Sequence, residues 1–404
     1  MKSYLILILS GILVLSCNKK PNIPTAELKN SDEIREMLIL AEDGAVIEIP
    51  EGKYEFTRSI TIDGVSDITI KGAGMDKTIL SFKMQEEGAE GIIANADNIV
   101  IEDLAVLDTK GDAIKVIDSD GVTFRNLKIG WTGGSKTDNG AYGLYPVSSK
   151  NVLVENCEVF AASDAGIYVG QTTNSVIRNN YVYNNVAGIE VENCTYADVY
   201  GNRCEGNAGG ILVFDLPELK VKNGRHIRVY DNDIEKNNHK NFAPKGNTAA
   251  MIPAGTGLLL MACKDVDVFD NRISNNKSVN TAVVSYLITQ KPFDDEEYNP
   301  YVSGIYIHNN VYENKMSLPD LSRDMGKLIA FLFKGSAPDI IYDGIVDPST
   351  ISDDGEIVPE KKICVQNNEN AGFVNIDAPN EFENVSEDPS ECDCSLSKLK
   401  AVSV

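Results

Sequence analysis

Short apolar alternations repeat along most of the chain, and each one ends in a polar corner. Residues 174–194 read NSVIRNNYVYNNVAGIEVENC, and the same arrangement recurs over 150–172, 195–214, 264–276 and 304–314. The shared template is I-x-I-x-x-N-x-I, then a corner, then G-I-x-V, and Asn180 and Asn202 are 22 residues apart. Each alternation predicts a short strand with one buried face, and no helical periodicity separates the strands.

Strands this short cannot bury their apolar faces alone, but stacked turns of the same repeat can. The sequence therefore predicts an all-β fold, a right-handed parallel β-helix, in which equivalent strands lie about 4.8 Å apart. One inward row should form an amide ladder in which each side chain bonds the next. Its members are Asn180, Asn202, Asn232, Asn271 and Asn310, and Cys157 takes the same position one turn earlier.

A row of outward-facing residues supports this register. It runs Glu102, Arg125, Glu155, Arg178, Tyr200, Tyr230, Phe269 and His308. Opposite charges alternate in the first half and rings follow in the second, and such cross-strand pairs each contribute up to about 1 kcal/mol. We expect this row to be structural.

Both ends of a β-helix need caps because its sheet edges are open. Asn30 or Ser31 can cap an N-terminal helix that is apolar on one face between residues 34 and 41. The repeat fades after about residue 333. We therefore expect the capped β-helix to span 31–334, with an irregular, acidic extension over 335–404 that packs on it. In an oxidising compartment, Cys364 is expected to pair there with Cys394 or Cys392.

The N-terminal residues have the features of a targeting signal rather than of a folded element. MKSYLILILSGILVLSC contains an apolar run that is too short to span a membrane comfortably. Val14-Leu15-Ser16-Cys17 resembles the lipobox of a bacterial lipoprotein signal peptide. We expect a signal peptide over 1–17, lipidation of Cys17, a tether over 18–30, and a lipid-anchored protein of the cell envelope. The alternative is an ordinary cleaved signal peptide in which Cys17 is incidental.

Charge and histidine content exclude two classes of function. The net charge of 37 − 60 = −23 argues against nucleic-acid binding, which requires a basic surface. The three histidines, His226, His239 and His308, are scattered, so no histidine-based metal site is expected.

Several motifs carry a family resemblance. NGAYGLYPV, SDAGIYVGQ, AGIEVEN, GGILVFDLP and the closing CDCSL resemble an uncharacterised family of exported bacterial β-helix proteins within the pectin-lyase-like superfamily. The resemblance spans most of residues 30–404 and implies the fold, while known superfamily members mostly cleave or epimerise acidic polysaccharides. Neither the Asp-Asp and Gly-His-Gly pattern of polygalacturonases nor the Asp-Pro-His of mannuronan epimerases is found on the turns.

Two insertions leave the same corner of the repeat, at residues 130–142 and 237–256, with three plain turns between them. They are expected to rise as two walls beside an open groove, whose floor is the outward face of the strand after that corner. The floor reads Tyr145, Tyr168, Glu190 and Leu212. Aromatic rings and carboxylates in a groove suit a sugar chain.

Ten residues are the resulting site candidates. Asp164, Tyr168 and Glu190 are the catalytic candidates, with Glu190 or Asp164 as general base and Tyr145, Tyr168 or Lys240 as proton donor. The ligand-binding candidates are Trp131, Tyr142, Tyr145, Glu192, Asp215, His239 and Lys240. No cofactor is implied except Ca²⁺, which could bridge this acidic chain to a polyuronate. Repulsion between the acidic chain and a polyuronate is also partly offset by four basic residues, Lys220, Lys222, Arg225 and Arg228.

Two hypotheses follow from the sequence. The first is an exported, lipid-anchored protein that binds or modifies a polysaccharide, as a lyase, epimerase or glycoside hydrolase if it is an enzyme. The second is a non-catalytic scaffold that docks another exported protein along its flat sheet.

Overall fold

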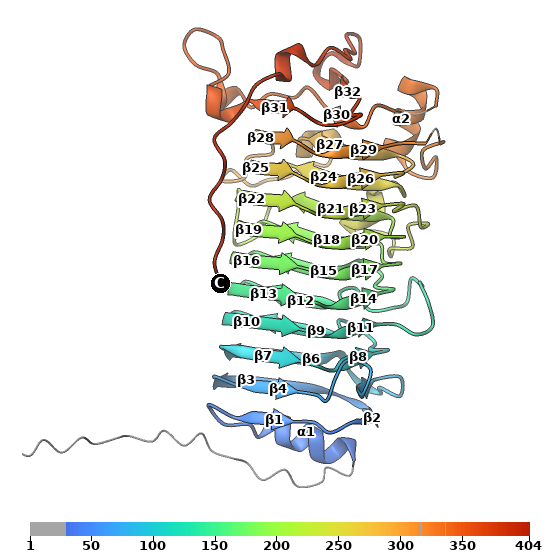
Figure 1. Ribbon diagram of the computed structural model, residues 1–404, viewed down its shortest axis with the longest axis vertical. Coiled ribbons are helices and arrows are strands. Elements are labelled where there is room, and N and C mark those ends of the chain that lie inside the picture. Colours follow the sequence, from blue (N-terminus) through green and yellow to red (C-terminus); the bar gives the residue numbers. More distant parts are fainter. Residues whose placement is uncertain (1–29, 316, 336) are drawn as a thin grey trace, which may run out of the picture.

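A computed structural model describes residues 30–315, 317–335 and 337–404 and shows a parallel β-helix. Its coils stack along one axis, with helix α1 (Ser31–Ile39) at one end and the C-terminal segments at the other (Figure 1). Every turn except the last contributes one strand to each of three sheets, because the Asn of the template divides the first alternation into two strands. The all-β solenoid expected from the repeat is confirmed.

The three sheets contain every described strand. Sheet 1 consists of β1 (Val46–Glu48), β4 (Thr69–Lys71), β7 (Ile99–Glu102), β10 (Asp120–Arg125), β13 (Lys150–Glu155), β16 (Thr173–Arg178), β19 (Thr195–Tyr200), β22 (Arg225–Tyr230), β25 (Lys264–Phe269), β28 (Ser303–His308) and β31 (Ile363–Gln366). Sheet 2 consists of β2 (Gly52–Glu55), β5 (Thr78–Ser81), β8 (Ala105–Leu107), β11 (Lys128–Gly130), β14 (Glu158–Phe160), β17 (Tyr181–Tyr183), β20 (Arg203–Glu205), β23 (Asp233–Glu235), β26 (Arg272–Ser274) and β29 (Val311–Glu313). Sheet 3 consists of β3 (Arg58–Ser66), β6 (Glu87–Asp97), β9 (Ile114–Ile117), β12 (Leu144–Val147), β15 (Ala165–Gly170), β18 (Ala187–Glu192), β21 (Gly209–Phe214), β24 (Thr256–Met261), β27 (Val279–Val284), β30 (Ile340–Tyr342) and β32 (Phe373–Asn375).

The expected amide ladder lies inside the corner between sheets 1 and 2. Asn180 Nδ2 donates to Asn202 Oδ1 at 2.9 Å, and Asn202 Nδ2 donates to Asn232 Oδ1 at 3.0 Å. The chain of bonds continues through Asn271 and Asn310 to Asn368, and Cys157 N–H begins it by donating to Asn180 Oδ1. A second ladder, which the repeat template did not predict, fills the corner between sheets 2 and 3 through Asn185, Asn207, Asn237, Asn276, Asn280 and Asp339.

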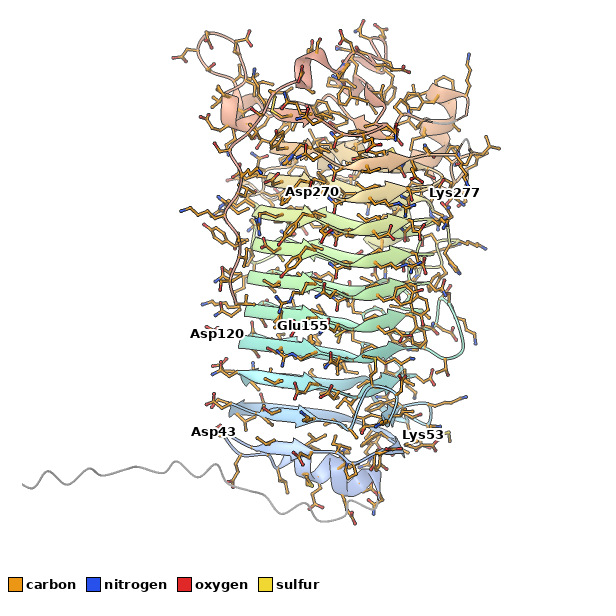
Figure 2. All side chains as sticks on the ribbon, in the orientation of Figure 1. Asp43, Lys53, Asp120, Glu155, Asp270 and Lys277 are labelled. Carbon is orange, nitrogen blue, oxygen red and sulfur yellow. A yellow bond between two sulfur atoms is a disulfide. The ribbon has the colours of Figure 1, made fainter. Side chains whose placement is uncertain are left out.

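The outward row on sheet 1 has the predicted register. Arg125 bridges Glu102 and Glu155 at 3.2 and 2.6 Å, and Arg178 binds Glu155 at 2.6 Å. The rings that follow stack on neighbouring strands, at 4.7 Å for Tyr200 and Tyr230. Glu155 lies near the middle of this face in Figure 2. The charged and aromatic side chains of this row pair with one another, so the row is structural, as expected.

Helix α1 closes the N-terminal end of the solenoid. Asn30 is its N-cap, because its Oδ1 accepts a hydrogen bond from the Glu33 backbone N–H at 3.0 Å. Ile34 and Leu38 are fully buried against the first coil and join the core that fills the bore. The helix therefore covers the open end of the core.

The coils continue beyond the boundary expected at residue 334. Strands β30, β31 and β32 extend sheets 3 and 1 as far as Asn375. Long non-repeating segments separate these strands, so the 22-residue spacing is lost and the repeat could not reveal them. Short 3₁₀ helices connect this region: η3 (Pro348–Thr350), η4 (Pro359–Lys361), η5 (Ala378–Asn380) and η6 (Pro389–Cys392).

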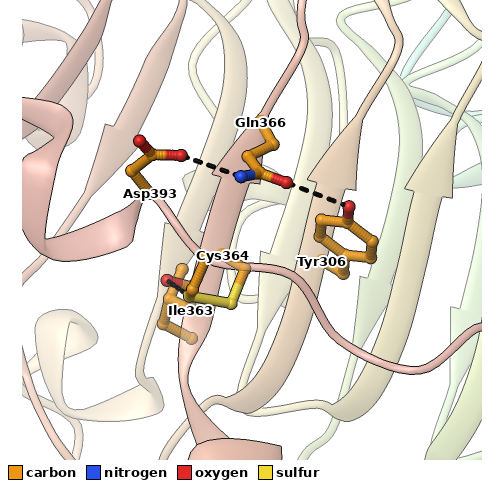
Figure 3. The surroundings of a disulfide bond; sticks show 6 residues. Tyr306, Ile363, Cys364, Gln366 and Asp393 are labelled. Carbon is orange, nitrogen blue, oxygen red and sulfur yellow. Dashed lines mark hydrogen bonds between the residues drawn. A yellow bond between two sulfur atoms is a disulfide. The ribbon is translucent and has the colours of Figure 1, made fainter.

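The last residues form a tail that runs beside sheet 1 and ends near β13 (Figure 1). A disulfide joins Cys364 on β31 to Cys394 at the start of the tail, while Cys392 is a buried free thiol. Gln366 links the two segments nearby, since it donates to Asp393 and accepts from Tyr306 (Figure 3). Further along, the Val402 backbone N–H donates to Asp198 at 3.1 Å.

The N-terminal predictions, including signal peptide, Cys17 and most of the tether, lie outside the described residues. Among the described helices, none is long and apolar enough to span a membrane.

Candidate functional site

Tyr145, Tyr168 and Glu190 share one outward row of sheet 3, as the sequence predicted. Tyr168 on β15 pairs in register with Glu190 on β18, and Leu144 on β12 pairs with Ile167. The strands begin with a column of glycines that keeps them close together. A Cβ on Gly188 would come within 2.6 Å of the Gly210 carbonyl oxygen, so the Ala-Gly and Gly-Gly steps of the motifs are required.

Three tyrosine rings and four carboxyls gather around this row. The ring centroid of Tyr142 lies 4.6 Å from that of Tyr145 and 4.5 Å from that of Tyr168. Lys115 places its Nζ 4.9 Å from the Tyr145 ring centroid. We call this group the tyrosine–carboxyl cluster; it comprises Asp112, Lys115, Tyr142, Tyr145, Asp164, Tyr168, Glu190 and Glu192.

Burial shifts the acidities of the cluster. It raises the pKa of Asp112 and of Asp164 to about 6 and the pKa of Glu192 to about 7. Burial, together with the neighbouring Asp164 and Glu192 carboxyls, raises the pKa of Glu190 well above its usual value. Burial also raises the pKa of Tyr145 to about 12. Carboxyls that hold a proton near neutral pH are typical of functional sites, although structural burial has the same effect.

The two insertions bracket this face, but they close over it instead of leaving an open groove. Ser135 of the first insertion donates to the Asn184 carbonyl at 2.6 Å. Asn247 of the second insertion reaches back to Asp164 and donates to its Oδ2 at 3.1 Å, whereas Asp164 Oδ1 has no hydrogen-bond partner. As a result Tyr168 is 5% exposed and Glu190 is 3% exposed. The expected floor is therefore outward-facing but covered.

The open part of the cluster lies one to two coils nearer the N-terminus. Asp112, Lys115, Tyr142 and Tyr145 are all half-buried, so a ligand can reach them. Asp112 is anchored by the Tyr142 backbone N–H, which donates to its Oδ1 at 3.1 Å. Asp112 and Lys115 are not among the site residues predicted from the sequence, although the alternation DAIKV at 112–116 places Lys115 in the same outward row as Tyr145.

The remaining sequence candidates lie apart from the cluster. Trp131 is 4% exposed, packs in the bore of the helix and donates its indole N–H to the Thr109 carbonyl, so it does not line a groove. Asp215 is 1% exposed and accepts a hydrogen bond from the Gly224 N–H, which closes a structural loop. His239 and Lys240 belong to the second insertion and line a large cavity, whose lining also includes Glu190 of the cluster.

That cavity has a volume of about 1010 Å³ and lies along the C-terminal half of sheet 3. The second insertion forms one side with its 3₁₀ helix η1 (Thr248–Met251), and helix α2 (Asp324–Phe333) forms another. Helix α2 is not among the elements predicted from the sequence, because its residues fall within the range expected to form coils of the β-helix. Its apolar positions 325, 328, 329, 332 and 333 have helical spacing, which was the available signal.

No metal site can be assigned from the described residues, since no group of three or more His, Cys, Asp or Glu side chains is placed to hold an ion. The carboxyls of the tyrosine–carboxyl cluster pack among tyrosine rings rather than in an arrangement that would hold a metal ion.

Comparisons with known proteins place the fold. A family model for the right handed beta helix region matches residues 58–223 and 138–318, which together cover more than half of the 404 residues. No curated protein matches the sequence. The A-module of an Azotobacter vinelandii mannuronan C-5 epimerase is 15% identical with a TM-score of 0.51, over 81% of this chain and 86% of that one.

Two further solved structures are less similar. The Streptococcus pneumoniae surface adhesin PfbA is 13% identical with a TM-score of 0.47, over 78% of this chain and 85% of the adhesin. Endopolygalacturonase I from Stereum purpureum is 13% identical with a TM-score of 0.42, over 71% of this chain and 96% of the enzyme. At these identities the likeness concerns the fold alone.

Proposed function

The chain belongs to the right-handed β-helix family, and we propose that it binds a polysaccharide at the open end of the tyrosine–carboxyl cluster. One observation carries this proposal: Tyr142 and Tyr145 present half-buried rings beside Lys115 and Asp112 on an outward face. Rings pack against the CH faces of sugars, while a lysine and a carboxyl bind hydroxyl or carboxylate groups. The mannuronan epimerase of similar fold is named for action on a polysaccharide, which makes glycans the first class to test.

A glycan array probed with the purified soluble chain tests this proposal, with Tyr145→Ala as the matched variant. Tyr145 is half-buried on the outward face, so its removal should leave the fold intact while ring contacts to the ligand are lost. We expect loss of about 1–3 kcal/mol of binding free energy, or roughly tenfold or more in Kd. A control is Tyr181→Ala, since Tyr181 is an exposed ring on sheet 2. Equal binding by wild type and Tyr145→Ala to every hit would place the glycan elsewhere.

Modification of the bound glycan is a second candidate, favoured by the raised carboxyl pKa values. Of the predicted catalytic candidates, Asp164 and Tyr168 are buried under the second insertion, and Glu190 is buried and lines the large cavity rather than the open face. Asp112, with a pKa of about 6, and Tyr145 are more accessible and form the better acid–base pair. Product analysis on any glycan hit separates binding from catalysis, with Asp112→Asn as the inactive variant.

Two other hypotheses remain proposals. Lipid anchoring at Cys17 rests on the Val-Leu-Ser-Cys junction. Docking of another exported protein would be favoured if no glycan binds and a partner is captured on the exposed sheets.

A further inference from the structure

The floor of the large cavity is a continuous apolar strip on the outward face of sheet 3. One row runs in register from Glu190 through Leu212, Leu259 and Ala282 to Ile341, on five neighbouring strands. Four steps between strands span about 19 Å. The strip therefore has the length of a long aliphatic chain.

The walls of the cavity have the same character. The second insertion contributes Phe242, Met251 and Ile252, and α2 contributes Met325, Ile329 and Leu332. Leu259, Ile252 and Leu332 line the cavity and are only half-buried, so part of their apolar surface lacks protein partners. A sugar chain would find few hydrogen-bonding groups along this strip, whereas hydrocarbon would fit it.

The exposed charged residues of the cavity lining, which we call its mouth, are mostly basic, in contrast to the chain as a whole. The lining residues that are exposed or half-exposed with a positive charge are Lys136, Lys240, Lys245, Lys291 and Arg323. None of these five forms an ion pair with any described residue. Asp324, the exposed acid in the lining, is already paired with Lys327 at 2.8 Å. Five cations without ion-pair partners in the lining of one cavity, on a chain with net charge −23, complement an anionic group.

Glu190 closes one end of the apolar strip. It is 3% exposed, it lines the cavity, and its carboxyl has no hydrogen-bond partner among the described residues. A molecule bound in the cavity can therefore contact this carboxyl. Burial and the neighbouring Asp164 and Glu192 carboxyls raise the pKa of Glu190 well above its usual value, which disfavours a negative charge at this end of the strip.

We propose that this cavity binds a long-chain anionic amphiphile, whose aliphatic chain lies along the sheet 3 strip and whose carboxylate or phosphate head is held by the basic mouth. This site is distinct from the open end of the tyrosine–carboxyl cluster. It does not depend on glycan binding.

Binding of palmitate to the soluble chain, measured by calorimetry and by displacement of a fluorescent fatty acid, tests the proposal. Palmitoyl lysophosphatidylglycerol replaces the carboxylate with a phosphate head, and cetyl alcohol removes the charge. We expect one molecule of palmitate or of the lysolipid to bind per chain and cetyl alcohol to bind at least about tenfold more weakly. Absence of saturable binding by both anionic probes would overturn the proposal.

Two variants locate the bound molecule. Ala282→Trp should fill the middle of the strip and abolish binding. The double variant Lys240→Glu, Lys245→Glu should weaken palmitate binding about tenfold. It should not affect folding, because both side chains are exposed. Lys83→Glu with Lys150→Glu makes the same charge change at exposed positions outside the cavity lining and should have no effect.

If both double lysine variants weaken palmitate binding equally, the effect is one of overall charge and the assigned site is overturned. This comparison holds even if Ala282→Trp fails to fold. Tyr145→Ala should bind palmitate normally. Failure of glycan binding and failure of amphiphile binding are therefore separate outcomes.

Discussion

At the scale of single residues, buried amides hold the coils in register. Asn202 links three coils, because its Oδ1 accepts from Asn180 while its Nδ2 donates to Asn232 and to the Ile177 carbonyl. Its side chain is 1% exposed, so water cannot replace these bonds. The same geometry repeats along both ladders, which explains why the sequence places Asn at two corners of each turn between residues 180 and 276.

Asn202→Ala should therefore lower the melting temperature strongly. Each buried group left without a partner costs about 1–3 kcal/mol, and the variant removes the acceptor used by both Asn180 donors. Asn380→Ala is the control, because Asn380 is exposed and bonds only the neighbouring Asp377. Thermal unfolding of both variants decides the matter; similar melting temperatures would contradict a structural role for the ladder.

Buried carboxyls give the fold a pH dependence of definite sign. Burial raises the folded-state pKa of Glu192 from 4.5 to about 7, so the protonated form is favoured on folding. The contribution of protonated Glu192 to the free energy of unfolding is then fully present below about pH 4.5, and it is lost as the pH rises through 7. Glu192→Gln should gain stability relative to the wild type at pH 8 but not at pH 4, by an amount on the order of 3 kcal/mol. Denaturant unfolding at both pH values measures this, and an unchanged difference would mean that Glu192 is ionised at little cost.

At the scale of elements, regular spacing decided what the sequence could reveal. The strands of coils between about residues 99 and 314 follow one template, so their register, the first ladder and the outward row were predictable. The second ladder was equally visible in principle, because Asn185, Asn207, Asn237 and Asn276 each follow a member of the first ladder by five residues. Helix α2 and strands β30–β32 occur once each, outside any period.

The candidate site was predictable only in part for the same reason. The row of Tyr145, Tyr168 and Glu190 follows from strand alternation. The bond from Asn247 to Asp164 spans 83 residues and comes from an insertion with no repeat, so nothing in the sequence showed that the floor is covered. Trp131 lies just after β11, and an isolated residue in a loop carries no periodicity that would have placed it in the core.

The C-terminal tail is an element held at one end by a covalent bond. Cys364 and Cys394 close a loop over a sequence separation of 30, a length for which a disulfide typically contributes about 2–4 kcal/mol. Cys394→Ser should therefore release the tail from sheet 1 and lower the melting temperature. Limited proteolysis should then cleave near residues 395–404 before the coils, whereas in the wild type the tail should resist. Val402→Pro offers a milder comparison, because it removes only the N–H that donates to Asp198. A tail that is equally resistant in all three proteins would show that the disulfide does not hold it.

At the scale of the whole molecule, a lipid anchor would determine where the protein meets its ligands. If Cys17 is lipidated, the elongated solenoid stands on a membrane surface and meets its ligands there. Cys17→Ala in the full chain should move the protein from the membrane fraction to the soluble fraction, or block its maturation. Detergent partitioning with mass analysis of the mature N-terminus checks this, and unchanged partitioning would exclude the anchor.

The net charge of −23 limits which polysaccharide the cluster can hold. The basic residues expected to counter it are partly committed, since Lys222 pairs with Glu297 and Arg228 pairs with Asp198. Lys115 is then the main cation beside Tyr145, against several carboxyls. A polyuronate should therefore bind only when Ca²⁺ bridges its carboxylates to the protein, while a neutral glucan should bind independently of Ca²⁺. Binding measured at physiological salt, with a Debye length of about 8 Å, in Ca²⁺ and in EGTA separates the two. Equal polyuronate binding in EGTA would show that Lys115 suffices and that Ca²⁺ has no part.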